Sequence, residues 1–220
     1  MRKWLSMAVT FVCVAWVFCT VVPEALAFPH HLQVGDTQLY SETPIPEVAA
    51  RNILARSDRL LRASPIAGPG YGRRIFLTDG GWRWRLLAPG SQTTIAISRP
   101  FIETIVFNRS DIANDSVMTR ANTSGRRSLS GVIAHERTHG LIRAHFGPLA
   151  DWRYPIWLRE GYCDLVAGGG TLSDAEAAAL KARGEAAPAL VYYDGRKRVE
   201  AVLKRNGGSV ERLFAEAGKP

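Results

Sequence analysis

Residues 131–165 read GVIAHERTHGLIRAHFGPLADWRYPIWLREGYCDL, and this stretch decides how the rest of the chain is interpreted. It holds two helical patterns separated by Gly147-Pro148, because glycine suits the end of a helix and proline cannot continue one. His135 and His139 are four residues apart, so on a helix both side chains project from the same face. We therefore expect two successive helices, the first of which carries a pair of imidazoles.

The two imidazoles can share one metal ion, and nearby acids can complete its site. A hydrolytic zinc needs a third protein ligand and one open position, and Glu160 on the following helix can be that ligand. Glu136 is adjacent to His135 and can act as the general base that takes a proton from water. Asp164, one turn beyond Glu160, can hydrogen-bond the outer nitrogen of a ligating histidine. The stretch predicts one Zn²⁺ bound by His135, His139 and Glu160.

Each of these residues also has a plainer interpretation. The two histidines can be buried and satisfied by Glu136 or by backbone groups, and Glu160 and Asp164 can belong to a solvated charged face. Glu160, however, stands among the apolar residues of PIWLREGY, and a buried carboxylate needs a cation. Cys163 can be a metal ligand, but a buried core residue is the favoured interpretation because free cysteine is commonly buried. The metal site explains the whole set better.

The chain before this stretch changes from a helical to a strand pattern. A helix is expected over 47–64, followed by short β-prone runs. Asp79-Gly80-Gly81 predicts a hairpin between the first two runs. The four expected strands are RRIFLTD (73–79), WRWRLLA (82–88), TTIAIS (93–98) and ETIVFN (103–108). With helices expected to the C-terminus, the fold class is α+β: a helix, a small mostly antiparallel sheet, then a helical metal-binding half.

The N-terminal 27 residues have the composition of an export signal. Arg2 and Lys3 precede an uncharged apolar run, and Ala25-Leu26-Ala27 has the small-x-small form of a cleavage site. We favour cleavage at this site. The apolar run approaches the length of a membrane span, however, so retention as an anchor is the alternative. Either way the rest of the chain is exported, with residues 28–44 as a linker and 45–220 as the catalytic domain.

Composition and charge exclude other classes of protein. The chain of 220 residues is 46% hydrophobic and 22% charged, which is a globular composition. Its formal net charge of +8 comes from scattered basic residues without a nucleic-acid-binding motif, so a basic surface near anionic lipid or cell-wall polymer is expected instead. Cys163 is the one cysteine beyond the leader, so an intrachain disulfide is excluded after cleavage. The oligomeric state has no signal in the sequence.

HERTH followed by WLREGYCD resembles the gluzincin metallopeptidases, the group that contains thermolysin and the zinc aminopeptidases. The likeness covers about residues 70–217. It implies a zincin-like fold, zinc ligands at His135, His139 and Glu160, a general base at Glu136 and an outer partner at Asp164. It also implies an edge strand that pairs with an extended peptide substrate, for which ETIVFN is the expected segment.

A second likeness lies in YYDGRKRVEAVLKRNGGSVERLF (192–214). It is similar to the segment of aminopeptidase-like members whose tyrosine donates a hydrogen bond to the developing oxyanion, which implies that role for Tyr192. A packing role for Tyr192, or the oxyanion role for Tyr193, is the alternative. The chain lacks the G-x-M-E-N segment with which those aminopeptidases bind a free amine, so exopeptidase action is not expected.

Two functions of different classes follow from the sequence. The first is zinc-dependent, endopeptidase-like hydrolysis of a peptide or protein outside the cytoplasmic membrane, in a bacterial periplasm, extracellularly or on an anchor. The second is a non-catalytic zinc-containing binding module of the envelope. Glu136 favours the enzyme, because a purely structural zinc site does not need a general base and usually fills its fourth position with Cys or His.

Overall fold

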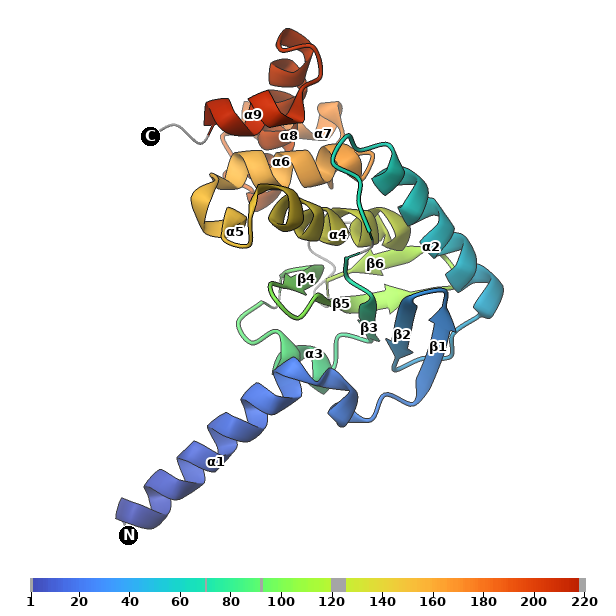
Figure 1. The fold of residues 1–220 in the computed structure, drawn as a ribbon, viewed down its shortest axis with the longest axis vertical. Coiled ribbons are helices and arrows are strands. Elements are labelled where there is room, and N and C mark those ends of the chain that lie inside the picture. The colour runs from blue at the N-terminus through green and yellow to red at the C-terminus, as the bar shows by residue number, and fades with distance from the viewer. Residues whose placement is uncertain (1, 70, 92, 120–125, 218–220) are drawn as a thin grey trace.

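The computed structural model describes residues 2–69, 71–91, 93–119 and 126–217. It has an N-terminal helix, a mixed seven-stranded sheet and a helical C-terminal half, so the expected α+β class is confirmed. In Figure 1 the first helix, α1 (Arg2–Val21), projects from the body, and the C-terminal helices lie on the opposite side of the sheet. Helix α1 is long and apolar enough to cross a membrane, which is compatible with a signal peptide or an anchor.

The segment expected as a linker, 28–44, is instead part of the sheet. After a short 3-10 helix, η1 (Pro23–Leu26), strands β1 (His30–Val34) and β2 (Thr37–Ser41) form an antiparallel hairpin. Gly35 occupies the turn with a φ of 56°, a conformation that favours glycine. The linker prediction was wrong because β1 alternates half-buried with exposed residues and β2 alternates buried with half-buried ones, which leaves their sequence polar on average.

The sheet is mixed, and two of its neighbouring pairs are parallel. The strand order is β1-β2-β3-β5-β6-β7, with β4 paired to β5. The pairs β2–β3 and β3–β5 are parallel and the other four are antiparallel, so the expected mostly antiparallel pairing holds within the described residues. The remaining strands are β3 (Arg74–Thr78), β4 (Ala96–Arg99), β5 (Thr104–Asp111), β6 (Ser116–Met118) and β7 (Arg127–Ser128). Helix α2 (Glu47–Arg62) provides the crossover between the parallel strands β2 and β3.

The run WRWRLLA is a helix and not the expected strand. Helix α3 (Trp82–Leu87) buries Trp84 and Leu87, which are three residues apart, and leaves Trp82 51% exposed. Alternation predicted that Trp82 and Trp84 share a face, but a run this short fits either period. The expected hairpin at residues 79–81 is therefore also wrong, and that turn leads into α3 instead.

The expected edge strand is also corrected. ETIVFN forms most of β5, which pairs with β3 on one side and with β4 and β6 on the other. Its residues Thr104–Asn108 are all buried, as expected for a strand inside a sheet. In the described part of the chain, β4 pairs only with β5, so β4 is the edge strand on that side.

The helical half follows the expected boundaries closely. Ser128 caps the helix that holds HERTH by accepting a hydrogen bond from the Gly131 amide, and that helix ends before Gly147. The capping box of Ser173 and Glu176 is present. The helices are α4 (Leu129–Phe146), α5 (Ala150–Arg153), α6 (Ile156–Val166), α7 (Asp174–Ala182), α8 (Pro188–Arg205) and α9 (Val210–Ala217). Helix α8 begins at Pro188 and so includes Tyr192.

Three apolar clusters hold these elements together. The first joins α2 and α4 to one face of the sheet and includes Ile53, Phe107 and Ile133. The second lies among α4, α6, α8 and α9 and is centred on aromatic residues such as Phe214. The third covers the other face of the sheet and joins Phe76 to α3 and η1. Helix α4 therefore lies between two cores, which fixes the position of its polar side chains.

Candidate metal centre

Helix α4 carries its polar motif in a largely buried position. Every residue from Leu129 to Arg143 is buried, and His135 and His139 are only 4% and 8% exposed. The close packing of α6 against α4 brings the second acidic motif opposite these histidines. On its other side α6 packs closely against α8, which Gly161 makes possible because a Cβ there would lie 2.3 Å from the Gly195 carbonyl carbon.

The carboxylate of Glu160 meets both imidazoles, as the sequence predicted. Its Oε2 lies 3.2 Å from His135 Nε2 and 3.5 Å from His139 Nε2. Ligand atoms about 2.0–2.1 Å from a tetrahedral zinc are separated by about 3.3 Å, so both distances match a shared ion. The rings of the two histidines have their centroids 5.2 Å apart and are nearly perpendicular, at 70°.

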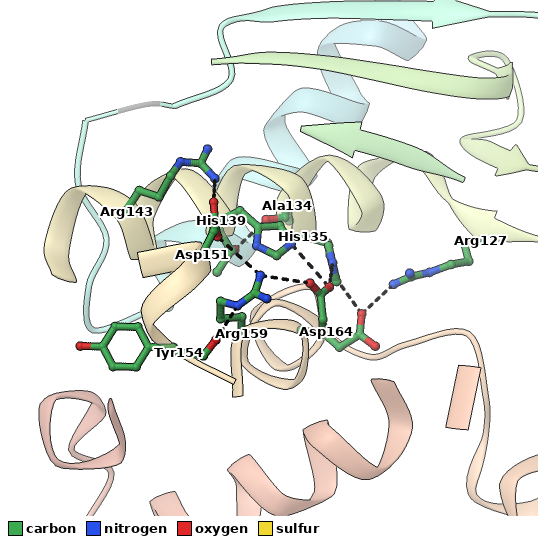
Figure 2. A network of polar contacts seen from close by, with 11 residues as sticks. Arg127, Ala134, His135, His139, Arg143, Asp151, Tyr154, Arg159 and Asp164 are labelled. Carbon is green, nitrogen blue, oxygen red and sulfur yellow. Dashed lines mark hydrogen bonds and ion pairs between the residues drawn. The ribbon is translucent and has the colours of Figure 1, made fainter. Parts of the chain in front are cut away.

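Asp164 supports His135 from the outer side. Its Oδ1 lies 2.8 Å from His135 Nδ1 and also accepts a hydrogen bond of 3.1 Å from Arg127 Nη2 (Figure 2). The carboxylate is completely buried. A proton on Nδ1, donated to Asp164, leaves the Nε2 lone pair of His135 free to bind a metal. Asp164 therefore occupies the position expected of an outer partner.

Electrostatics distinguish the cluster from an ordinary set of buried polar groups. Burial lowers the pKa of His135, but hydrogen bonds to Asp164 and Glu160 outweigh it and raise that pKa to about 10. Burial acts in the opposite direction on Glu160, and its contacts with His135 and His139 hold its pKa well below the usual value. The pKa of Asp164 is also lowered, because the hydrogen bond from His135 and the charge of Arg127 outweigh burial. The two carboxylates are thus ionised and attract a cation.

Cys163 offers a second possible donor. One ligand atom each from His135, His139 and Cys163 lie within 4.8 Å of one another, and this buried group can bind a metal ion. Burial, however, raises the pKa of the Cys163 thiol well above its ordinary value, and metals bind the thiolate. Glu160 is already ionised, and its distances to the two Nε2 atoms match the spacing of zinc ligands. It therefore suits a third-ligand position better than Cys163.

Glu136 and Tyr192 line a cavity of about 410 Å³ next to the histidines. Glu136 is 9% exposed, and the ring centroid of Tyr192 lies 6.4 Å from that of His135. Burial and the negative charge of Glu160 raise the pKa of Tyr192 to about 12, so its hydroxyl keeps its proton. Tyr193 instead donates to Asp174, outside the cavity lining. The structure thus favours Tyr192 over Tyr193 as the residue at the site.

The cavity also contains residues that the sequence analysis missed. Arg143 donates to Glu103 and to Asp151, and Arg159 lies 3.6 Å from Asp151. Figure 2 shows Arg143 and Arg159 on either side of Asp151. Arg143 could have been found, since it continues the four-residue spacing of the two histidines along α4. One wall of the cavity consists of residues 93–98, which include the first part of β4. This placement depends on strand order, for which the sequence carries no signal.

Comparisons with known proteins found no match: no family model, no curated protein and no solved structure is similar to this chain. The likeness to gluzincins therefore rests on the residues of the two motifs alone. What the chain can do has to be argued from the side chains that the fold brings together around the cavity.

Proposed function

We propose that this protein is a zinc-dependent peptide hydrolase of the gluzincin type that acts outside the cytoplasmic membrane. The observation that carries the proposal is the position of Glu160 Oε2, 3.2 Å and 3.5 Å from the Nε2 atoms of His135 and His139. These three donors would hold one zinc ion. A fourth position facing the cavity would remain for water or substrate, which is what a hydrolytic zinc site requires.

The donor set fits zinc by its chemistry. Two imidazoles and one carboxylate form a mixed nitrogen and oxygen set that suits zinc better than magnesium or calcium, which prefer oxygen ligands. Bound zinc supplies Lewis acidity, which makes water more acidic and polarises a carbonyl group. Asp164 contributes by fixing the orientation and tautomer of His135 through the 2.8 Å contact at Nδ1.

Glu136 is the proton carrier in this proposal. Its carboxylate lines the same cavity as the two histidines, so it can take a proton from a water molecule there and later give it to the leaving amine. Tyr192 keeps its phenolic proton at neutral pH and can donate a hydrogen bond to the oxyanion that develops on the carbonyl. Neither residue is needed by a site that only stabilises the fold.

A peptide is the proposed substrate because a strand edge borders the cavity. Residues 93–98 form one wall, and β4 pairs only with β5 in the described part of the chain. An extended peptide can add to the other side of β4 through main-chain hydrogen bonds, which do not depend on substrate sequence. The role first expected for ETIVFN thus belongs to the neighbouring strand.

The N-terminal helix supports a location beyond the cytoplasmic membrane. Arg2 and Lys3 precede the apolar helix, which is the arrangement that keeps the N-terminus inside and sends the following domain across. The alternative function, a zinc-containing binding module without turnover, uses the same ligands. It would leave Glu136 without a role in the cavity, so we favour the hydrolase.

The decisive experiment compares the wild type with Glu136→Gln. Hydrolysis of unfolded, dye-labelled casein by the wild type should require zinc and stop with a chelator. The variant should keep one zinc per chain, measured by elemental analysis, but lose at least about 100-fold in rate, because general base catalysis contributes on that order. Glu216→Gln, at an exposed position on α9, is the matched control and should retain full activity.

Two results would separate the candidate functions. If wild type and Glu136→Gln both bind zinc and neither hydrolyses any unfolded protein or peptide library, the binding module is the better description. If Glu136→Gln hydrolyses as fast as the wild type, Glu136 is not the general base and the mechanism proposed here is wrong.

A further inference from the structure

Helix α1 has the length and surface of a lipid-embedded helix. Its apolar stretch, Lys3–Val21, is 19 residues long, and at 1.5 Å per residue it spans about 28 Å, close to the hydrocarbon thickness of a bilayer. Large apolar side chains are exposed along most of its length. They are Trp4, Leu5, Met7, Val9, Phe11, Val12, Val14, Trp16, Val17, Phe18 and Val21.

The chain passes from this helix into the folded domain almost without a break. Pro23 and Leu26 of η1 are buried, and Leu26 belongs to the apolar cluster of Phe76 and Trp84. The small-x-small sequence expected as a cleavage site, residues 25–27, therefore includes a residue of the core. A segment that served only as an export signal would not need to be packed into the core of the domain.

Two arginines of the domain bind the same segment, one through backbone carbonyl groups and the other through a carboxylate. Arg83 donates to the carbonyl oxygens of Leu26 and Ala27, each at 3.0 Å, and to Glu42 at 2.7 Å. Arg74 forms an ion pair of 3.1 Å with Glu24. The side chain of Arg83 is only 17% exposed, so loss of the two carbonyl acceptors would leave part of a buried cation unsatisfied.

Further contacts reach back onto α1 itself. The indole nitrogen of Trp16 donates to the carbonyl oxygen of Leu86 at 3.0 Å. The guanidinium of Arg99, at the end of β4, donates both to the carbonyl of Thr20 and to that of Leu87. Helix α1 is thus bonded to α3 and β4 by side chains from both partners, which fixes its direction relative to the domain.

We infer that the N-terminal segment is retained, and that the protein is seated on the outer surface of a lipid bilayer by α1 and the adjoining face of α3. Helix α3, which Trp16 and Arg99 connect to the end of the apolar helix, exposes Trp82 and Arg85. Tryptophan is enriched at the level of lipid headgroups, and arginine is attracted to anionic ones. Both side chains therefore suit a helix that lies against the bilayer surface.

Retention can be tested by the mass of the protein produced in bacterial cells with a C-terminal tag. We expect the full-length mass, including residues 1–27, in the membrane fraction, and we expect alkaline carbonate not to release it. A product shorter by those residues, or one recovered from the soluble periplasmic fraction, would overturn the inference. Neither result depends on whether the protein hydrolyses peptides.

A pair of variants tests whether the domain is packed onto its leader. In detergent micelles, Leu26→Ala should lower the melting temperature of the full-length protein by roughly 5 °C or more, because it leaves a cavity beside Phe76 and Trp84. Val12→Ala removes a similar apolar side chain from an exposed position on α1 and should leave the melting temperature unchanged. Equal melting temperatures for the two variants would contradict a packed junction.

Discussion

The two sides of helix α4 bury ionisable groups in different ways. On one side Arg137, 5% exposed, donates to Asp58 at 2.9 Å and to the Thr37 hydroxyl at 2.7 Å, so a permanent cation meets its anion. On the other side His135 and His139 face Glu160, and the cationic charge there depends on a proton. The first arrangement is complete as it stands, whereas the second can exchange its proton for a metal ion.

This difference separates an ion pair that is complete from a group that can bind a metal ion, both on a single helix. Arg137 keeps its charge over the physiological range although burial lowers its pKa, because arginine starts from a very high value. His135 is a neutral metal ligand once its Nε2 proton is removed. An acid opposite a buried arginine therefore indicates stability, and a buried acid opposite two imidazoles makes a group that can bind a metal ion.

The largest expected effect is the loss of metal on the histidine side. His139→Ala removes one of the three proposed ligands, so we expect bound zinc to fall from one per chain to near zero at micromolar concentrations, and hydrolysis to be lost with it. His145→Ala is the matched control, because this histidine is on the same helix with a side chain 40% exposed. Elemental analysis after dialysis gives the answer, and full zinc occupancy in His139→Ala would remove this residue from the ligand set.

The second prediction concerns the pH dependence of the metal-free protein. The pKa of His135 rises from 6.5 to about 10 on folding, so its contribution to stability is fully present below pH 6.5 and is lost as the pH rises towards 10. Urea unfolding at several pH values should show a decline of a few kcal/mol at most over that range. Zinc-loaded protein should lack this decline, because zinc replaces the proton. A metal-free protein whose stability stays constant from pH 6.5 to 10 would contradict the proposed charge state.

The smallest effect is expected on the arginine side. Arg137→Met should lower the free energy of unfolding by about 2 kcal/mol, since it removes buried hydrogen bonds while Asp58 stays partly exposed. Zinc content should not change. Arg51→Met, which breaks an exposed ion pair with Glu47, should cost less than about 1 kcal/mol and serves as the control. Loss of zinc in Arg137→Met would show that the two sides of α4 are not independent.

The position of the two histidines was predictable because its geometry is local. The four-residue spacing of His135 and His139 fixes a common face on any helix, and Gly147-Pro148 and Pro155 marked where the two helices end and begin. The direction of the second helix, which brings Glu160 next to both histidines, depends on tertiary packing and not on local sequence. The likeness of the two motifs to gluzincins supplied this step, and the measured distances agree with it.

The errors fell on features that local sequence does not encode. Alternation in the run beginning at Trp82 fitted a strand as well as a helix, and packing of Trp84 against Phe76 decided the outcome. Strand order was also unavailable, so β5 was taken for an edge although it is central. The small residues Ala25 and Ala27 fit a cleavage signal, whereas the burial of Leu26 between them depends on distant residues such as Phe76 and Val106.

The contact between Arg99 and Thr20 sets the distance between the cavity and the N-terminal helix. Arg99 ends the strand whose preceding residues, Ala96–Ser98, line the cavity, and a strand rises about 3.3 Å per residue. A retained anchor would therefore keep the cavity wall on the order of 10 Å from the end of the membrane helix. A flexible tether would let the domain reach a wide volume, whereas this rigid junction would restrict the proposed hydrolase to chains that pass close to the lipid surface.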